Sequence, residues 1–202
     1  MEIPDRIIVA TRNRHKALEF AQIFGSAVEI LTATDIDQQL RWDETGHSFE
    51  ENALIKARCV AAAASSRYPK AWVMADDSGL CVNYLGGAPG IYSSRFGGEE
   101  GNDSLNNKRL LAELLNVQDR TASFHCCLVV CMPGMAEIVF HGVLDGLVIE
   151  AGRGANGFGY DPLFIPNGYS VTFAELPIEI KNRISHRAKA SKAMIEWISS
   201  QK

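Results

Sequence analysis

The sequence lacks any apolar run that approaches the roughly 18–20 residues of a membrane-spanning helix, so we expect no membrane partner. Its first residues, MEIPDRIIVA, lack the basic flank and long apolar segment of a signal peptide. The five cysteines are an odd number without a CxxC pair, and several lie in apolar strand patterns where a reduced cysteine acts as a small hydrophobic residue. These absences favour a reducing, cytoplasmic setting.

The 20 Lys and Arg residues are fewer than the 24 Asp and Glu residues, and neither an internal repeat nor a low-complexity linker is present. The formal net charge is −4, so we expect no nucleic-acid partner. With 47% hydrophobic and 22% charged residues among 202, the composition is typical of a globular chain that forms one large or two small domains.

One stretch, Ala75–Gly98, concentrates residues suited to a charged ligand. Asp76 and Asp77 end an apolar run, and Ser78 and Gly79 follow at once, which predicts a turn beside the two acids. Acids at the junction of a strand and a turn are exposed on one side and held rigidly on the other. This arrangement suits a metal or phosphate site.

The remainder of that stretch predicts a second short strand, a sharp loop and a cation. The strand covers Leu80 to Leu85, and three glycines with Pro89 then let the backbone approach a ligand closely. Arg95 offers a forked cation that suits phosphate. Each piece alone is equally typical of an acidic turn, a tight loop or a surface arginine, and only the combination favours a site.

The N-terminal segment predicts an anion site. A short strand, Arg6 to Ala10, leads into the polar residues 11–16, where Asn13 is a plausible N-cap for a helix that ends at Gly25. Free N–H groups and the helix dipole favour an anion at such a point. Arg12 and Arg14 oppose the dipole there, so a bound anion explains them better than a solvated first turn does.

A second helix is predicted behind a capping box. Ser48 and Glu51 have the capping-box spacing, and apolar residues recur at helical spacing from Phe49 to Ala64. The cap accounts for Glu51 but not for Glu44, which precedes the helix. Lys56 lies on the helix, where an exposed lysine is the default interpretation.

The central and C-terminal parts are less specific. A strand at Val28 to Leu31, a helix capped by Asn102 or Asp103, and a hairpin formed by residues 121–132 and 136–150 are expected. Two histidines in the hairpin, His125 and His141, are interpreted as structural and left out of the site.

Two further segments carry candidate residues. In the glycine-rich loop 152–162, Phe158 or Tyr160 would stack on a base, or both rings turn inward. Residues 181–187 lead a C-terminal helix whose start Ser185 can cap or flank, and His186 and Arg187 offer donors for purine acceptors or phosphate. An ordinary charged helix end is the alternative.

Taken in order, these motifs resemble the inosine triphosphate pyrophosphatase family in its bacterial form, the XTP/dITP diphosphatases. The matching segments are Ala10-Thr11-x-Asn13-x-x-Lys16, Ser48-Phe49-x-Glu51-Asn52-Ala53-x-x-Lys56-Ala57-Arg58, Asp76-Asp77-Ser78-Gly79 with Arg95, Gly157-Phe158-Gly159-Tyr160-Asp161-Pro162, and Lys181 with Ser185-His186-Arg187. The ordered set extends over nearly the whole chain, which makes the resemblance specific.

The resemblance implies an α/β fold, a long mixed central β-sheet flanked by helices, with two lobes around an active-site cleft and residues 1–202 as a single domain. It implies Mg²⁺-dependent hydrolysis of ITP, dITP or XTP to the monophosphate and pyrophosphate by a homodimer. Mn²⁺ is an alternative cation, since it accepts the same oxygen ligands.

The resemblance also assigns roles. Glu44 and Asp77 would hold the metal, and Asp77 would accept the proton of the attacking water. The substrate-binding residues that it implies are Thr11, Arg12, Asn13, Arg14, His15, Lys16, Lys56, Ser78, Phe158, Gly159, Tyr160, Asp161, Lys181, His186 and Arg187. A donor from His186 or Arg187 would favour the O6 acceptor of inosine over the adenine amino group.

Two departures from the family pattern bear on substrate preference: Arg12 and Ala188 stand where many relatives have glycine. The alternatives are a pyrophosphatase for modified pyrimidine nucleotides and a nucleotide-binding regulator without activity. Intact Glu44, Lys56 and Asp77 disfavour the regulator.

Overall fold

The computed structural model describes residues 3–201, and its strands form one six-stranded sheet in the order β2-β1-β3-β4-β5-β6. The strands are β1 (Arg6–Val9), β2 (Glu29–Thr32), β3 (Trp72–Val82), β4 (Thr121–Cys131), β5 (Ile138–Val148) and β6 (Phe164–Pro166). β1 pairs in parallel with β2 and β3, whereas β5 and β6 are antiparallel. The sheet is therefore mixed, as expected from the sequence.

The chain divides into two compact units, and the three long strands contribute to both. Unit 1 comprises residues 1–77, 126–142 and 187–202, and unit 2 comprises residues 78–125 and 143–186. The expectation of a single domain over 1–202 stays a prediction. Within the described range, no helix combines the length and hydrophobicity needed to cross a bilayer.

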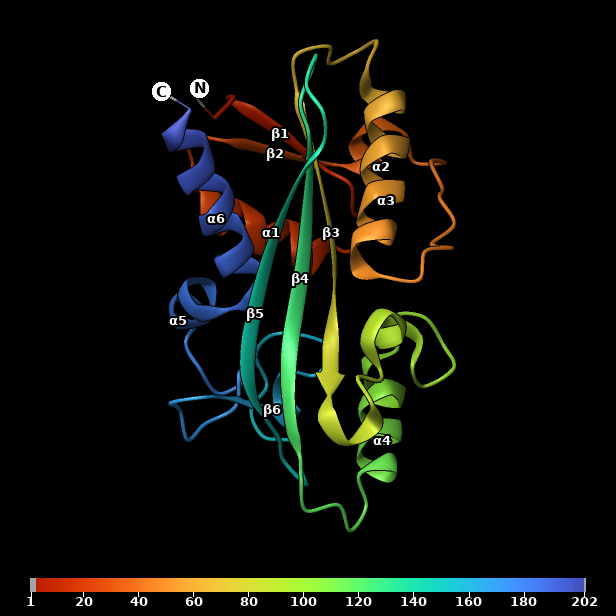
Figure 1. Cartoon of the computed structure of the whole chain (residues 1–202), viewed down its shortest axis with the longest axis vertical. Coiled ribbons are helices and arrows are strands. Elements are labelled where there is room, and N and C mark those ends of the chain that lie inside the picture. The colour runs from red at the N-terminus through yellow and green to blue at the C-terminus, as the bar shows by residue number, and fades with distance from the viewer. Residues whose placement is uncertain (1–2, 202) are drawn as a thin grey trace. The chain divides into compact units, whose positions relative to one another are not determined.

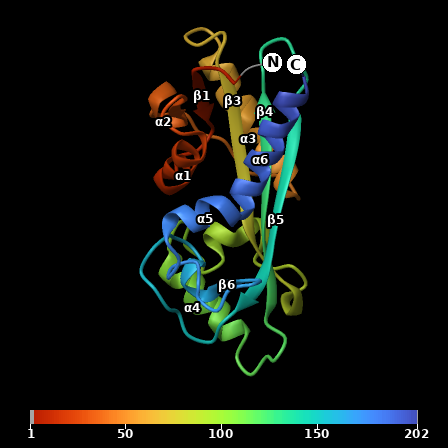
Figure 2. The ribbon, with the colours of Figure 1, turned by 90° about the vertical axis from the view of Figure 1, so that its left-hand side faces the viewer.

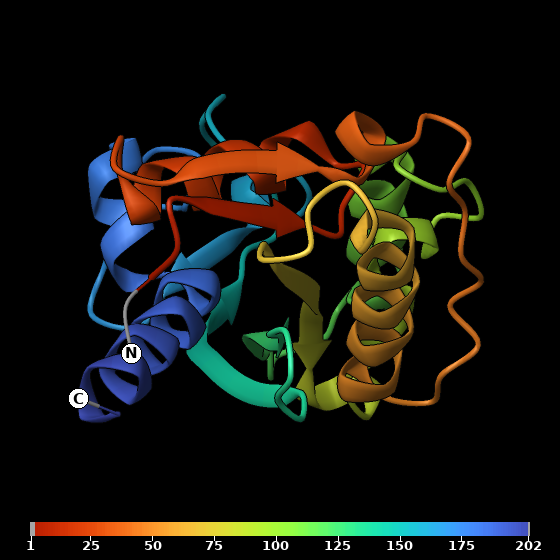
Figure 3. The same cartoon turned by 90° about the horizontal axis from the view of Figure 1, so that it is seen from above.

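In unit 1, helices cover both faces of the sheet (Figure 1, Figure 3). Helices α1 (Arg14–Phe24) and α6 (His186–Ser200) pack on one face, over Ile7, Val9, Met74 and Leu128. Helices α2 (Ala33–Ile36) and α3 (Phe49–Ala64) cover the other face, over Ile8, Val73, Cys127 and Val129. Neighbouring residues of one strand thus alternate between the two cores, as the pleat requires.

Unit 2 has its own core, to which α4 (Asp103–Glu113) contributes Leu110 and α5 (Ile178–Ile184) adds Ile180. Figure 2 shows α4, α5 and β6, which all belong to this unit. Phe124, Phe164 and Phe173 form an aromatic cluster at its centre. Three short 3₁₀ helices, Asn83–Leu85, Gly90–Arg95 and Asp161–Leu163, complete the unit.

The predicted helix caps at Asn13, Ser48 and Asn102 are present, the last through a hydrogen bond that the Asn102 side chain accepts from the Leu105 N–H. The Asn13 side chain accepts hydrogen bonds from the N–H groups of His15 and Lys16 and begins α1. The Ser48 hydroxyl accepts from the Glu51 N–H, while the Glu51 carboxylate accepts from the N–H of His47. The reciprocal bond of the capping box is therefore made one residue earlier than the motif predicts.

The expected turn at Ser78 and Gly79 is wrong, because β3 runs unbroken from Trp72 to Val82. Asp76 and Asp77 lie in mid-strand and are buried. Long-range ion pairs make this possible, since a buried carboxylate is tolerated where a cation pairs with it. The second short strand is wrong as well: it is the end of β3, which gives way to a 3₁₀ helix at Asn83.

The C-terminal helix begins directly after Ser185, as the sequence predicts, but residues 178–184 form an additional helix that was not predicted. Lys181 lies in α5, and α6 begins at His186. Ser185 separates them with extended dihedral angles, φ −62° and ψ 158°. An extended residue cannot continue the helical hydrogen bonds, so the chain changes direction there.

Candidate active site

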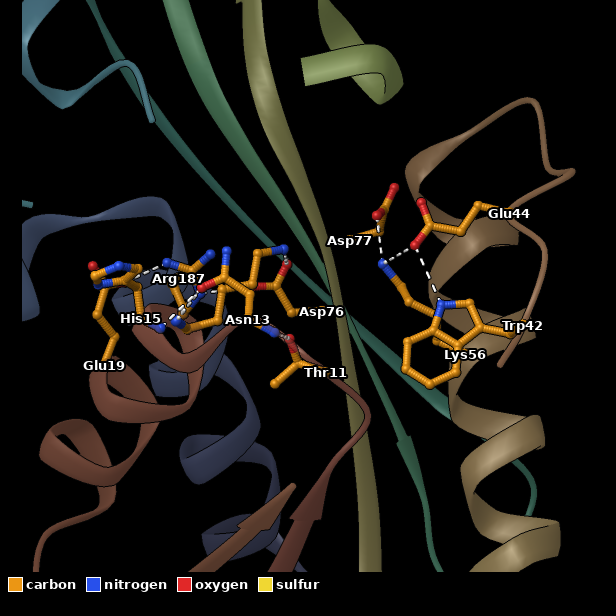
Figure 4. A network of polar contacts seen from close by, with 11 residues as sticks. Thr11, Asn13, His15, Glu19, Trp42, Glu44, Lys56, Asp76, Asp77 and Arg187 are labelled. Carbon is orange, nitrogen blue, oxygen red and sulfur yellow. Dashed lines mark hydrogen bonds and ion pairs between the residues drawn. The ribbon is translucent and has the colours of Figure 1, made fainter. Parts of the chain in front are cut away.

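Asp76 and Asp77 are sequence neighbours whose side chains point to opposite faces of β3 (Figure 4). Asp76 faces α1 and α6, because its contacts are Lys16 and Arg187. Asp77 faces α3, where it contacts Lys56. One strand position therefore separates two clusters of charge.

The first cluster is centred on Arg187, which is 1% exposed. Its Nε donates to Asp76 Oδ2 at 2.6 Å, its Nη1 pairs with Glu19, and its guanidinium lies over the Phe20 ring. Lys16 Nζ reaches the second oxygen of Asp76 at 3.2 Å. Asp76 is thus held by two cations.

These pairs set the protonation of the first cluster. Burial is the largest influence on Asp76 and raises its pKa, but attraction to Arg187 and Lys16 outweighs it and brings the pKa below the usual range. Burial likewise lowers the pKa of Arg187, and Asp76 and Glu19 reverse that effect. Both partners stay ionised at neutral pH.

The second cluster brings together Glu44, Lys56 and Asp77. Lys56 Nζ lies 2.5 Å from Asp77 Oδ1 and 3.4 Å from Glu44 Oε1. Lys56 is buried, contrary to the default of an exposed lysine. Asp77 Oδ2 is buried and has no hydrogen-bond partner among the described residues.

The second cluster contains two carboxylates, Glu44 and Asp77, and one ammonium group, that of Lys56. Burial, the largest influence, lowers the pKa of Lys56, but attraction to Asp77 and Glu44 outweighs it and the pKa is raised. Burial raises the pKa of Asp77 further than Lys56 lowers it, and Glu44 raises it again. The excess of negative charge favours a cation at this place.

The loop that carries Glu44 is tied to the first turns of α3. The Gly46 N–H donates to the Asn52 side chain at 2.9 Å, and Trp42 Nε1 approaches Glu44 Oε1 at 3.4 Å. A Cβ at Gly46 would lie 2.6 Å from the Cβ of Glu51, closer than side chains approach one another. Glycine at position 46 therefore permits the close approach that places Glu44 beside Lys56.

The predicted anion site lies at the start of α1. The Thr11 hydroxyl accepts a hydrogen bond from the Asn13 N–H, and the Asn13 side chain accepts from the N–H groups of His15 and Lys16. Arg12 and Arg14 are exposed. The turn is therefore preformed, with two cations beside the capped helix end, while a phosphate contact there stays a prediction.

In unit 2 the glycine-rich loop is held by buried Asp161, whose Oδ2 accepts from Lys181 Nζ at 2.5 Å and from the Phe158 N–H at 2.8 Å. Lys181 Nζ also lies 4.7 Å from the centre of the Phe158 ring. A Cβ at Gly157 would fall 2.0 Å from Asp161 Oδ2, so only glycine fits.

The two aromatic residues of the loop have different environments. Tyr160 is buried, and its hydroxyl donates to the Ser93 carbonyl at 2.9 Å. The sequence left open whether Tyr160 stacks on a base or turns inward, and in the structure its ring turns inward. Phe158 remains half-buried and is the ring that a base would reach.

Helix α4 clamps the same loop. Asp103 Oδ2 accepts from the Gly159 N–H at 2.6 Å, and Asn107 Nδ2 donates to the Gly159 carbonyl at 3.0 Å. Both backbone groups of Gly159 are thereby fixed by side chains.

The two remaining candidates of unit 2 are placed differently. His186 is buried and stacks on Phe124, with ring centres 4.8 Å apart. Ser78 lies half-buried in β3, directly after Asp77. Ligand contacts for both stay predictions.

The structure thus brings Glu44, Lys56 and Asp77 together, as the proposed chemistry requires. Sequence reasoning missed Glu19, a buried acid that pairs with Arg187. The signal that was available is its position one residue before Phe20 and three after Lys16, which places it on the inner side of α1.

Comparison with known proteins gives consistent matches. The profile of the Ham1 family matches residues 7–197. A dITP/XTP pyrophosphatase from Bacillus licheniformis is 45% identical over 191 residues, which cover 93% of this chain and 95% of that relative.

Solved structures of similar proteins align with nearly the whole chain. The Staphylococcus aureus Ham1 protein aligns with a TM-score of 0.84 and 36% identity, covering 98% of this chain and 100% of that one. A structure described as a nucleoside-triphosphatase / dITP/XTP pyrophosphatase, from Mycobacterium abscessus, aligns with a TM-score of 0.73 and 39% identity, covering 94% of this chain and 98% of that one.

Proposed function

The chain belongs to the Ham1 family, and from this premise we propose that it hydrolyses dITP, ITP and XTP to the monophosphate and pyrophosphate with Mg²⁺. It is a nucleoside triphosphate pyrophosphohydrolase, as relatives that cover nearly its whole length are named. The resemblance to inosine triphosphate pyrophosphatases is thereby confirmed. The metal, the substrate range and the residue roles are the proposal.

The observation that carries the proposal is the cluster of Glu44, Lys56 and Asp77. Asp77 Oδ2 is buried with no hydrogen-bond partner in the described part of the chain, and leaving such an oxygen unpaired is costly. Oxygen ligands and an excess of negative charge fit a hard divalent cation. Glu44 and Asp77 would hold Mg²⁺, or Mn²⁺ with the same donors, and the bound ion would offset phosphate charge and acidify water.

The hydrolytic step needs a base, and Asp77 supports this role. In the step, a water oxygen attacks the α-phosphorus, the bond to the bridging oxygen breaks, and pyrophosphate leaves with its electron pair. The proton of the water passes to the Asp77 carboxylate. Since its pKa is raised by burial, Asp77 is a stronger base than an ordinary aspartate. Lys56 holds Oδ1 and so orients the carboxylate.

The triphosphate carries about four negative charges at neutral pH, which must be matched by cations. The residues assigned to this task in unit 1 are Thr11, Arg12, Asn13, Arg14, His15, Lys16 and Lys56. Their support is the capped, preformed turn at α1 together with the two exposed arginines. A third cationic side chain, Lys16, is held in place by Asp76.

For recognition of the nucleobase, the proposal rests on the family assignment and on the fixed conformation of the glycine-rich loop in unit 2. Phe158 offers an aromatic face beside Lys181, and Asp161 fixes both. His186 and Arg187 are the proposed donors to O6. Since the guanidinium of Arg187 already pairs with Asp76 and Glu19, a base contact by Arg187 would require those pairs to be shared.

The test is a substrate panel. Purified protein is incubated with dITP, ITP, XTP, GTP, ATP and a modified pyrimidine triphosphate in Mg²⁺, and products are identified by ³¹P NMR. We expect monophosphate and pyrophosphate from the first three. Faster cleavage of the pyrimidine nucleotide would favour the alternative substrate class. Tight binding of ITP without any product would favour the non-catalytic regulator.

A further inference from the structure

A second group of potential metal ligands lies in unit 1, apart from Glu44 and Asp77. It consists of Glu50, Cys127 and His141, whose ligand atoms all lie within 4.8 Å of one another. They come from three elements: Glu50 from the first turn of α3, Cys127 from β4 and His141 from β5. None of them has a role in the proposed hydrolysis, so the inference does not rest on that function.

Strand alternation explains the convergence. On β4, Cys127 and Val129 point to the face that α3 covers, whereas Cys126 and Leu128 belong to the opposite core. On β5, Phe140 belongs to that opposite core, so its neighbour His141 points to the α3 face. Sulfur and imidazole therefore lie on the face over which the helix begins.

The carboxylate of Glu50 completes the group. The helix cap is formed by its neighbour Glu51, so Glu50 is not engaged there. Glu51 accepts the His47 N–H, whereas Glu50 Oε2 lies 3.8 Å from His141 Nε2. The side chains of Glu50 and His141 are 51% and 61% exposed, while Cys127 is buried beneath them. A cation from solvent would meet the carboxylate and imidazole first and the sulfur last.

The chemistry of the three ligands selects the kind of ion. Mg²⁺ takes oxygen ligands only, whereas sulfur and imidazole suit Zn²⁺ and related ions. Bonds of about 2.0–2.3 Å in a tetrahedral zinc site place the ligand atoms roughly 3.5 Å apart. The observed separations are at most 4.8 Å and so exceed this value by no more than about 1.3 Å, a gap that the two exposed side chains can close by changing rotamer.

We propose that Glu50, Cys127 and His141 bind Zn²⁺ or a similar thiophilic divalent cation, with water as the fourth ligand. Without the ion the thiol is protonated, because burial, and then the charge of Glu50, raises the pKa of Cys127 to about 12. Binding forms a metal–sulfur bond and releases the thiol proton to solvent.

The test uses Co²⁺ as a spectroscopic substitute for Zn²⁺, added to the full chain under reducing conditions in excess Mg²⁺. We expect a near-ultraviolet thiolate-to-cobalt band that saturates at one equivalent and disappears when Zn²⁺ is added. Cys127→Ser abolishes the band, and Cys131→Ser, on the same strand, retains it. Absence of the band in the wild-type chain, or its persistence in Cys127→Ser, overturns the proposal.

Two exposed substitutions keep the proposal falsifiable if Cys127→Ser fails to fold. Glu50→Gln and His141→Gln are each expected to weaken Zn²⁺ binding at least about tenfold, measured by competition with a chromophoric chelator. His47→Gln, which alters another exposed histidine near the helix start, is the matched control and leaves affinity unchanged. Unchanged affinity in both Glu50→Gln and His141→Gln excludes the site.

Discussion

At the scale of single residues, environment separates two adjacent aspartates into different chemical roles. Asp76 lies between Arg187 and Lys16, which keep its pKa below the usual range. Asp77 shares one lysine with Glu44, and burial raises its pKa. The first acid is therefore a fixed anion that organises cations, and the second is suited to accept a proton.

Asp77→Asn is expected to lower kcat by about 10²–10⁴-fold, because the amide cannot accept the proton of the attacking water. Lys56 keeps a hydrogen-bond acceptor, so the fold should be retained. Steady-state hydrolysis of dITP measures the loss, and circular dichroism checks the fold.

The matched control for this substitution is Asp43→Asn, which removes an exposed carboxylate one residue before Glu44. It should leave the rate within about twofold of wild type, as for surface substitutions generally. Equal losses of kcat in the two variants would mean that negative charge near the site is required, and not proton acceptance by Asp77.

Asp76 should make stability depend on acid pH. Its folded pKa lies below its ordinary value of 3.8, so its ion pairs contribute fully above that pH and are lost as the pH falls below it. The thermal midpoint of the wild-type chain should fall steeply below about pH 4. Asp76→Asn should lower stability at neutral pH by about 3 kcal/mol, as for other broken buried pairs, and should reduce the acid dependence. A wild-type acid slope that persists unchanged in the variant would contradict this assignment.

The sequence identified Asp76 and Asp77 as candidate site residues but did not predict that they lie buried in the middle of a strand. Ser78 and Gly79 indicate a turn from local propensity, and this signal is outweighed by cations that are distant in sequence. Lys56 is 21 residues from Asp77, and Arg187 is 111 residues from Asp76. A window of neighbouring residues contains no trace of such partners, so burial of the acids was not predictable from it.

At the scale of elements, the loop before α3 and the helix itself act together. The backbone of Gly46 packs against Glu51 and Asn52, and this contact positions Glu44. The helix therefore supplies Lys56 and also anchors the acid that faces it.

Gly46→Ala is expected to displace Glu44 and lower kcat/KM by roughly 10²-fold, because a shift of about 1 Å in a catalytic group has that effect. The Mg²⁺ concentration for half-maximal rate should rise. Gly152→Ala is the control, since a Cβ there meets its nearest neighbour at an ordinary 3.5 Å. If both variants behave like wild type, the close contact at Gly46 is not required for Glu44.

In unit 2, α4 fixes the glycine-rich loop through Asp103. Asp103→Ala leaves the Gly159 N–H without its acceptor, which should cost about 1 kcal/mol in substrate binding and raise KM about fivefold. The value of kcat should change little, because Asp103 takes no part in proton transfer. Ser104→Ala, an exposed neighbour, is the comparison. A loss confined to kcat would remove the loop from substrate binding.

Local signals were sufficient for elements whose ends are fixed by nearby atoms. Asn13 and Ser48 begin helices as predicted, because their caps bond to N–H groups within three residues. The start of a helix after Ser185 was also predicted, whereas the short helix Ile178–Ile184 before it was not. The residues on the two sides of Ser185 serve different cores: Ile184 packs against the core of unit 2, whereas Ala190 of α6 belongs to a core of unit 1.

At the scale of the whole molecule, the fold rests on three apolar clusters among residues 3–201, and none of them includes Glu44, Asp77 or Lys56. EDTA should therefore abolish hydrolysis while the circular dichroism spectrum and thermal midpoint change little. Excess Mg²⁺ should restore the rate, and Mn²⁺ should restore part of it. Hydrolysis that continues in EDTA would contradict the proposed metal dependence. The homodimer, the cytoplasmic setting and the absence of nucleic-acid binding stay predictions.

The opposite orientations of Asp76 and Asp77 have a consequence for how β3 can evolve. Deleting one residue upstream of the pair, for example Ala75, would exchange the partners of every later side chain in the strand. Asp77 would then occupy the place that faces Arg187, and Ser78 the place that faces Lys56, although the net charge of the chain would not change. We therefore expect natural variants of this segment to differ by substitution, with insertions and deletions confined to the loops beyond it.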